Sequence, residues 1–286
     1  MINELLDTST ELDNIANAFS SGDIESLMEL SGQSEKQAQS GLSRMNINYS
    51  EETEDGKLLS RGSWKMYKDG QYLYAESVEF RPLLRTYEWS VWDQETGTFS
   101  SKSVQKPTLK GSFPDSTGGD KCGRLSRDEE ESLSSDDPRV LQSRAAVCNQ
   151  VIYGTVSGTF KVGHQDGEEV TLDNTPVVSY FKKSGFRPIR EFIESLTKQK
   201  KIMQHCVIKL NTDRKKNGGI VYWVPVPTLA GEAPITEDDK NLMKMFTETV
   251  KGHNENIMNQ YRQVSKMLMD QEDIDLADDF KDDIAS

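Results

Sequence analysis

The sequence predicts an α+β protein with a β-rich core and an oligonucleotide-binding-type barrel, flanked by N-terminal helices and a long C-terminal helix. Residues 43–105 mix aromatic and β-branched residues with glycine turns, and no helix-length crossover interrupts them, which favours an antiparallel meander. Residues 206–230 hold two strand-like runs around Asn217-Gly218-Gly219, a sequence that tight hairpin turns favour. Residues 231–269 space apolar residues by three and four positions, which indicates a long helix.

The chain divides into four expected parts. Leu12, Ile15 and Phe19 share one helical face near the N-terminus, and a polar stretch follows them. The last residues are acidic and hold few apolar side chains, a composition typical of disorder. The expected parts are an acidic helical arm and linker (1–40), a β-rich core with a long loop at 106–140 (41–230), a C-terminal helix (231–269) and a disordered acidic tail (270–286).

Within the core, the expected strands come before and after the long loop. The loop is rich in glycine, proline and charge and shows no sustained period, so it is expected to be functional or disordered. Residues 145–160 are expected to form a strand pair at most, and residues 175–181 a further strand. Residues 186–201 predict a helix with one apolar face, and Pro225 and Pro227 indicate that the last strand lies at a sheet edge.

The C-terminal helix carries two sequence signals. Thr236 followed by Asp239 resembles a capping box. An apolar seam then repeats at heptad-like spacing and is interrupted by Gly252. Two interpretations of the seam stay open: packing on the β core, or self-association into a homodimer. The seam residues are Leu242, Phe246, Val250, His253, Ile257, Tyr261, Val264 and Leu268.

The charge is distributed unevenly along the 286 residues, whose net charge is −13. Residues 1–58 hold 12 acids and 3 bases, and residues 270–286 hold 8 acids and 1 base. Residues 176–230, in contrast, hold 11 bases and 3 acids. A basic central body with acidic ends is compatible with a nucleic-acid partner. No apolar run is long enough to span a membrane, and the three widely spaced cysteines favour a cytoplasmic location, the host cytoplasm if the protein is viral.

Catalytic and cofactor motifs are not found in the sequence. It contains neither GxxxxGK[ST] nor GxGxxG, and His164, His205 and His253 stand in no nucleophile motif, so we expect no enzyme and no cofactor. Cys122 and Cys148 could join Cys206 and two of the histidines in a zinc site. Structural zinc sites normally contain local ligand pairs such as CxxC, and this chain has none, so incidental thiols and no metal are the favoured interpretation.

The strands of the core interleave basic and aromatic residues. A protein that binds single strands uses cations to follow the phosphates and flat rings to stack on the bases. Alternation along a strand directs about half of the rings inward. The same stretches also hold Tyr67, Tyr72 and Tyr180. The candidates for contact with nucleic acid are Arg61, Trp64, Lys65, Tyr74, Arg81, Arg85, Tyr87, Trp89, Lys182, Lys183, Arg187, Lys209, Arg214, Lys215, Lys216 and Trp223.

This layout resembles that of bacteriophage single-stranded DNA-binding proteins: a basic–aromatic β body (about 59–230), a terminal helix and the acidic ending DIDLADDFKDDIAS. The resemblance implies sequence-independent coating of single-stranded DNA in phage-type replication or recombination. It also implies that the tail contacts a polymerase, primase or helicase. The tail residues for that contact are Ile274, Leu276, Asp278, Asp279, Phe280, Asp282 and Asp283. The alternatives are a virion or scaffold protein that assembles through the seam, and a DNA-processing nuclease.

Overall fold

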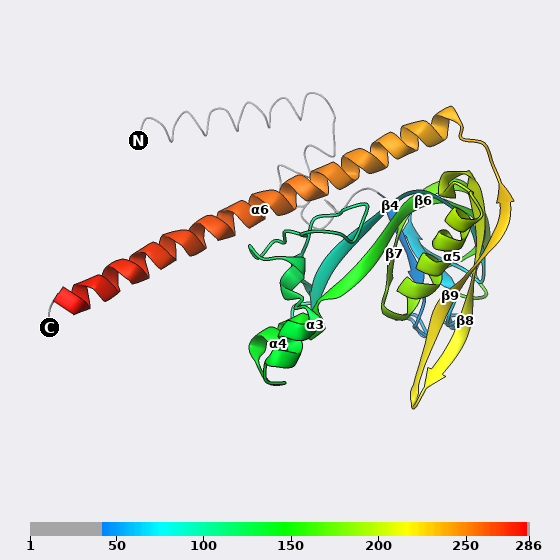
Figure 1. Ribbon diagram of the computed structural model, residues 1–286. Helices are drawn as coiled ribbons and strands as arrows, with labels where there is room; N and C mark the ends of the chain where they lie inside the picture. The colour runs from blue at the N-terminus through cyan, green and yellow to red at the C-terminus, as the bar shows by residue number, and fades with distance from the viewer. Residues whose placement is uncertain (1–41, 285–286) are drawn as a thin grey trace, which may run out of the picture. The chain divides into compact units, whose positions relative to one another are not determined.

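The computed structural model describes residues 42–284, with side chains to Met267 (Figure 1). The expected helices of residues 1–40 lie outside this range. The strands are β1 (Ser43–Ile47), β2 (Trp64–Lys68), β3 (Gln71–Ala75), β4 (Val78–Asp93), β5 (Thr98–Lys102), β6 (Val147–Val162), β7 (Glu169–Lys182), β8 (Cys206–Asn217) and β9 (Ile220–Glu232). The helices are α3 (Arg127–Ser132), α4 (Pro138–Ala145), α5 (Phe186–Lys198) and α6 (Glu237–Ile284), and a 3-10 turn, η3 (Lys183–Gly185), precedes α5.

Five strands close into a barrel in the order β1-β2-β3-β6-β7. Each neighbour is antiparallel except for the closing pair β1–β7, which is parallel. An up-and-down ring with an odd number of strands must contain one parallel pair, because its first and last strands run the same way. The predicted β-rich α+β class, with a closed barrel and a long C-terminal helix, is confirmed. Around the barrel, the strands are neighbours in the order in which they occur in the chain. The strands of the oligonucleotide-binding fold are instead connected as a Greek key.

The remaining strands extend the barrel into a wider sheet. β4 pairs with β6 over most of its length and with β8 at its start, and β5 pairs with β4. β6 is one strand of 16 residues with a register shift between Val156 and Gly158, where a strand pair at most was expected. The shift bends β6, so that one end belongs to the barrel and the other to the extended sheet.

The barrel interior is apolar. Trp64, Met66 and Phe160 are buried there with side chains of β1, β3 and β7. Helix α5 covers this core with Ile189 and Ile193, which confirms its predicted apolar face. In β2, Trp64 and Met66 therefore point inward, and the residues that alternate with them point outward.

The predicted hairpin and edge strand are confirmed. Asn217 pairs with Ile220, so Gly218 and Gly219 are the two central residues of the turn. Gly218 has φ +58, the left-handed conformation that such a turn requires at its first central residue. β9 pairs with β8 alone among the described strands, and Pro225 and Pro227 lie in it without disrupting a second ladder.

The segment expected to be a loop at 106–140 has internal structure. It contains α3 and the start of α4, and Ser126 and Glu129 form a capping box at α3. The buried carboxylate of Asp115 accepts hydrogen bonds from the backbone N–H groups of Thr117 (3.0 Å) and Cys122 (2.7 Å). Side chain-to-backbone bonds of this kind order a chain without any periodic pattern, so the sequence gives no repeating signal for them.

Helix α6 packs its apolar seam on the β core. Phe246 lies 5.5 Å from the ring of Tyr153, and Ile257 is buried beside Val104. Asn254 binds the backbone of Gln105 reciprocally, accepting from its N–H at 2.6 Å and donating to its carbonyl at 2.9 Å. Of the two interpretations of the seam, these contacts support packing on the core. The backbone of α6 continues to Ile284, through most of the segment expected to be a disordered tail (Figure 1).

Candidate nucleic-acid interface

Several predicted contact residues are buried and serve the fold. Trp64 is 1% exposed, and its indole Nε1–H donates to the carbonyl of Leu210 at 3.0 Å. Arg81 is buried in an ion pair with Asp239, and Tyr87 packs against Phe186. A ring or cation enclosed by protein cannot reach a base or a phosphate. The expectation that Trp64, Arg81 and Tyr87 contact nucleic acid is therefore wrong.

Trp89, Arg85 and Tyr74 also lie against the body. Trp89 is half-buried beside the cluster that contains Cys122, and its indole Nε1–H is buried without a partner among the described residues. Arg85 is half-buried and lies over the Tyr87 ring at 5.5 Å. Tyr74 is buried, and this burial raises the pKa of its hydroxyl. Burial of these three side chains limits their access to a nucleic acid, although Arg85 forms no ion pair with a side chain of residues 42–267.

An exposed basic–aromatic patch lies on the outside of the barrel. Because Trp64 and Met66 point inward, Lys65 and Tyr67 of β2 point outward. Tyr67 is 52% exposed and Tyr72 is 47% exposed, and their ring centroids are 5.0 Å apart. The Lys65 ammonium lies 4.1 Å from the centre of the Tyr72 ring. We call the set Arg44, Lys65, Tyr67, Tyr72, Tyr180 and Lys182 the outer-face cluster.

The strand register aligns this cluster in a row across the barrel. Tyr72 of β3 pairs with Tyr67 of β2. The pairing of Met45 with Met66 then places Arg44 of β1 next to Tyr67. Arg44 pairs on its other side with Val178 of β7. Neighbouring strands are about 4.8 Å apart, so the row from Tyr72 to β7 spans on the order of 15 Å.

The β7 end of the row is rich in positive charge. The Arg44 guanidinium lies over the Tyr180 ring at 4.2 Å, and burial raises the pKa of the Tyr180 hydroxyl. Partial burial, followed by the positive charges of Arg44 and Lys183, lowers the pKa of the Lys182 ammonium. An anion bound here would offset the mutual repulsion of these cations. Arg44, Lys182 and Lys183 outnumber the buried carboxylate of Glu88, whose charge also raises the pKa of Tyr180, so the net charge at this end favours a phosphate.

A second group of predicted residues meets at the base of the β8–β9 hairpin. Trp223 packs its ring on Gly62, where a Cβ atom would lie 2.2 Å from the indole. Tyr49 meets Trp223 edge-on at 6.1 Å, and Arg61 lies over the same ring at 5.8 Å. Arg61 also forms an ion pair with Glu51 at 2.5 Å. Trp223 is thus used mainly to hold the hairpin, and Arg61 is partly neutralised.

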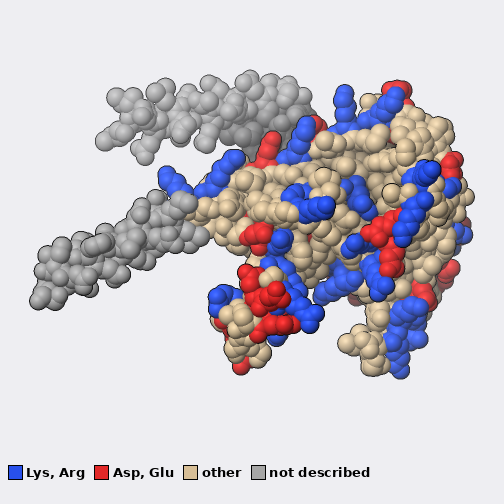
Figure 2. Space-filling model, in the orientation of Figure 1, with Lys and Arg blue, Asp and Glu red and all other residues tan. Residues whose placement is uncertain are grey.

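The other predicted cations are dispersed. Arg187 pairs with Glu191 at 2.7 Å, and Lys215 pairs with Asp213 at 2.6 Å, so both are locally neutralised. Lys183 is exposed in η3, next to Lys182. Arg214 and Lys216 are exposed on the hairpin, where Figure 2 shows Lys and Arg side chains gathered. The lower left of that view, over α3 and α4, mixes both signs of charge.

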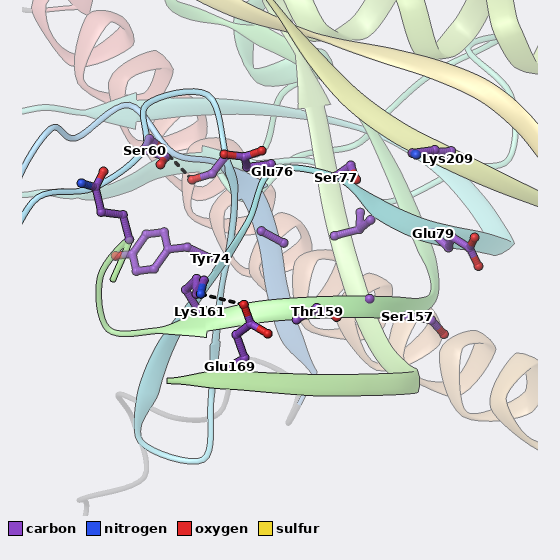
Figure 3. Close-up of a pocket in the computed structure, with 15 residues that line it drawn as sticks. Ser60, Tyr74, Glu76, Ser77, Glu79, Ser157, Thr159, Lys161, Glu169 and Lys209 are labelled. Carbon is purple, nitrogen blue, oxygen red and sulfur yellow. Dashed lines mark hydrogen bonds and ion pairs between the residues drawn. The ribbon is translucent and has the colours of Figure 1, made fainter. Parts of the chain in front are cut away.

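The pocket shown in Figure 3 adjoins the outer face of the barrel at the β3–β4 corner, and its volume is about 510 Å³. Lys209 and Lys161 contribute ammonium groups, and Lys161 is paired with Glu169 at 2.7 Å. Glu76 and Glu79 add two further carboxylates to the lining. The carboxylates outnumber the ammonium groups, so this pocket does not complement a phosphate chain.

The cysteines and histidines do not form a metal site in the described part. Among residues 42–267, no three His, Cys, Asp or Glu side chains lie close enough together to hold a metal ion. Burial raises the pKa of the Cys122 thiol to about 12, and burial likewise raises that of Cys148 to about 12. His253 contacts the Ser103 carbonyl at 3.0 Å and so belongs to the docking of α6. No helix in the described range is long and apolar enough to cross a membrane.

We expect Cys122 and Cys148 to resist a water-soluble disulfide reagent while the protein is folded. Only the thiolate attacks, so raising a thiol pKa from about 8.5 to about 12 lowers the reactive fraction roughly 10³-fold at about pH 8. Absorbance of the released chromophore, followed with and without denaturant, measures this. A native protein whose thiols all react at the denatured rate would contradict the packing around them.

A scan against protein-family models, a search of curated proteins and a search of solved structures each gave no match to this chain. The candidates predicted from the sequence include Lys65 and Lys182 of the outer-face cluster, but not Arg44, Tyr67, Tyr72 or Tyr180. The charge of Lys65 is a usable signal in the sequence, because a lysine in a strand is expected on the solvent-facing side. Tyr67 lies two residues further along β2 and therefore faces the same side.

Proposed function

We propose that the protein binds single-stranded DNA without sequence specificity through the outer-face cluster. The observation that carries this proposal is the row across β3, β2, β1 and β7, in which the exposed rings of Tyr67 and Tyr72 stand next to half-buried and exposed cations. Exposed rings with adjacent cations suit a strand whose bases are unpaired, because every base has a flat face that can stack. A duplex keeps its bases stacked on one another and cannot use the rings in this way.

The geometry supports a short path across the strands. Bases stack on Tyr67 and Tyr72, whose rings are inclined at 61° and so cannot both lie flat on one base. Lys65 lies over the Tyr72 ring, and Arg44 is next to Tyr67 in the register and near Lys182. These three cations neutralise the phosphates that follow the bases. A row on the order of 15 Å long accommodates a few nucleotides, which agrees with the site sizes of small single-strand binders.

Binding of this kind must depend strongly on salt. In a triple variant, Lys65, Arg44 and Lys182 are each replaced with Gln. We expect the slope of log affinity against log salt to become shallower by about 2, because each of three phosphate contacts on a single strand contributes about 0.7. Anisotropy of a labelled dT strand across a salt series measures the slope. The matched control changes three exposed lysines of residues 42–267 outside the cluster, Lys57, Lys198 and Lys200, to Gln.

The control variant removes the same net charge and should keep the wild-type slope. If the slope of log affinity against log salt falls equally in both triple variants, the strand responds to the overall charge of the protein. The outer-face cluster is then not the binding path. If the wild-type protein does not bind the strand at all, the proposed function is wrong.

We also propose, as the sequence resemblance implies, that the acidic C-terminal segment contacts replication proteins. The side chains of residues 270–286 lie outside the described part, and the support for this role is their alternation of carboxylates with Ile274, Leu276 and Phe280.

A further inference from the structure

The outer half of the β8–β9 hairpin projects from the body as a two-stranded ribbon (Figure 1). All residues from Asp213 to Ile220 are exposed. The strands stay paired to the tip, where the two glycines form a narrow turn. Five residues of strand extend about 17 Å at 3.4 Å per residue. The ribbon contacts the body at the Arg214–Trp223 pair, and the residues beyond that pair project past the barrel.

The base of the ribbon is fixed to the barrel. Thr212 Oγ1 donates to the carbonyl of Gly62 at 2.6 Å, and the Tyr49 hydroxyl donates to the carbonyl of Trp223 at 3.2 Å. The Trp223 ring fills the space over Gly62. These contacts come from the β1–β2 connection, far from the hairpin in sequence. They orient the ribbon, so its direction is a property of the fold.

One face of the ribbon is cationic. Arg214 and Lys216 of β8 point to the same face of the ribbon as Trp223 of β9, which pairs with Arg214. Neither cation forms an ion pair with a side chain of residues 42–267. Lys215 points to the other side and is neutralised by Asp213 at 2.6 Å. Figure 2 shows Lys and Arg side chains along the projecting hairpin. The face complements an anionic backbone.

The tip carries an apolar side chain. Ile220 is 72% exposed and has the highest exposed fraction of the large hydrophobic residues in the described part. An aliphatic side chain at the end of a basic ribbon has the form of a wedge that inserts between base steps, which several DNA-binding proteins use to unstack a duplex. The major groove of DNA is also wide enough to admit a two-stranded ribbon.

We propose that the β8–β9 ribbon is an arm for duplex DNA at the junction with a bound single strand. Arg214 and Lys216 contact phosphates on one face of the ribbon. Ile220 pairs with Asn217 and so points to the opposite face, where it enters the base step at the end of the duplex. The inference rests on the proposed function, because the outer-face cluster holds the adjoining single strand. It adds a second nucleic-acid contact of a different chemical kind.

The test compares three labelled probes by anisotropy at fixed salt: a dT strand, a blunt duplex, and the same duplex with a dT tail. We expect the wild-type protein to bind the tailed duplex on the order of tenfold more tightly than the dT strand. The Ile220→Ser variant should lose most of this preference and keep its affinity for the dT strand. Ile202→Ser is the matched control, because Ile202 is also exposed, at 61%, and lies outside the ribbon.

A 2-aminopurine base at the last pair of the tailed duplex provides a second measurement. Its emission should rise when wild-type protein unstacks the junction, and the rise should be absent with Ile220→Ser. Equal affinity for the dT strand and the tailed duplex, or a preference that survives Ile220→Ser, would overturn the arm while leaving single-strand binding intact. Failure to bind dT, together with Ile220-dependent binding of the tailed duplex, would instead overturn the single-strand proposal alone.

Discussion

Replacing Arg81 with methionine is expected to lower the free energy of unfolding by about 3–5 kcal/mol, because it leaves the carboxylate of Asp239 buried without its charge partner. The Arg81 Nη1 atom lies 3.0 Å from Asp239 Oδ2, and both side chains are only 10% exposed. Nε donates to the carbonyl of Gln204 at 3.0 Å, and Nη2 donates to that of Pro234 at 2.7 Å. One guanidinium thus joins β4, the segment before β8 and the start of α6.

Urea unfolding followed by far-ultraviolet circular dichroism measures this effect. Arg190→Met is the matched control: Arg190 pairs with Glu194 at 2.7 Å with both side chains about half exposed, so the unfolding midpoint should hardly change. Asp239 also forms the predicted capping box, accepting from the backbone N–H of Thr236 at 2.7 Å. If Arg81→Met is as stable as the control, the pair does not anchor α6.

The Tyr67→Ala and Tyr72→Ala double variant is expected to lower the affinity for a dT strand on the order of 100-fold. Loss of one base–ring stack costs about 1–3 kcal/mol, and the two rings stack on separate bases. Both side chains are about half exposed and lie on the outer face of the barrel, so the fold should keep its melting temperature. Titrations at several salt concentrations should show a parallel loss, because no cation is removed.

The control for this prediction replaces the same two tyrosines with phenylalanine. That variant keeps both rings and removes both hydroxyls, so near-wild-type affinity is expected. A Phe variant as weak as the Ala variant would mean that the hydroxyls carry the contact, and the stacking interpretation would be wrong. An Ala variant that binds as well as the wild type would remove the tyrosines from the interface altogether.

Local signals in the sequence were sufficient for several elements. Gly218 supplies the positive φ of the β8–β9 turn, and Thr236 with Asp239 caps α6 as predicted. The apolar face of α5 follows from its spacing alone, with Ile189 and Ile193 buried. These features depend on residues a few positions apart. Their physical causes act within one turn or one helix, so the sequence displays them directly.

The binding candidates depended on contacts between distant segments. Arg81 stands in a basic–aromatic stretch, yet β4 has β6 at one edge and β8 at the other, and Asp239 from α6 pairs with Arg81. Trp64 and Tyr67 lie on one short strand and point in opposite directions. Composition cannot distinguish a ring in the barrel from a ring on its surface. Only the register of β1, β2 and β3 decides which residues form the row.

The parallel pair that closes the barrel has a consequence for the kinetics of folding. Ser43 pairs with Val177, and β4, β5, α3, α4 and β6 all come between these partners in the chain. Closing so long a loop carries a large entropic cost before any contact repays it, and folds dominated by distant pairings fold in milliseconds to seconds. During synthesis β1 must wait for β7 to emerge, so barrel closure comes after the β2–β3 hairpin and the β4–β6 ladder have had time to form.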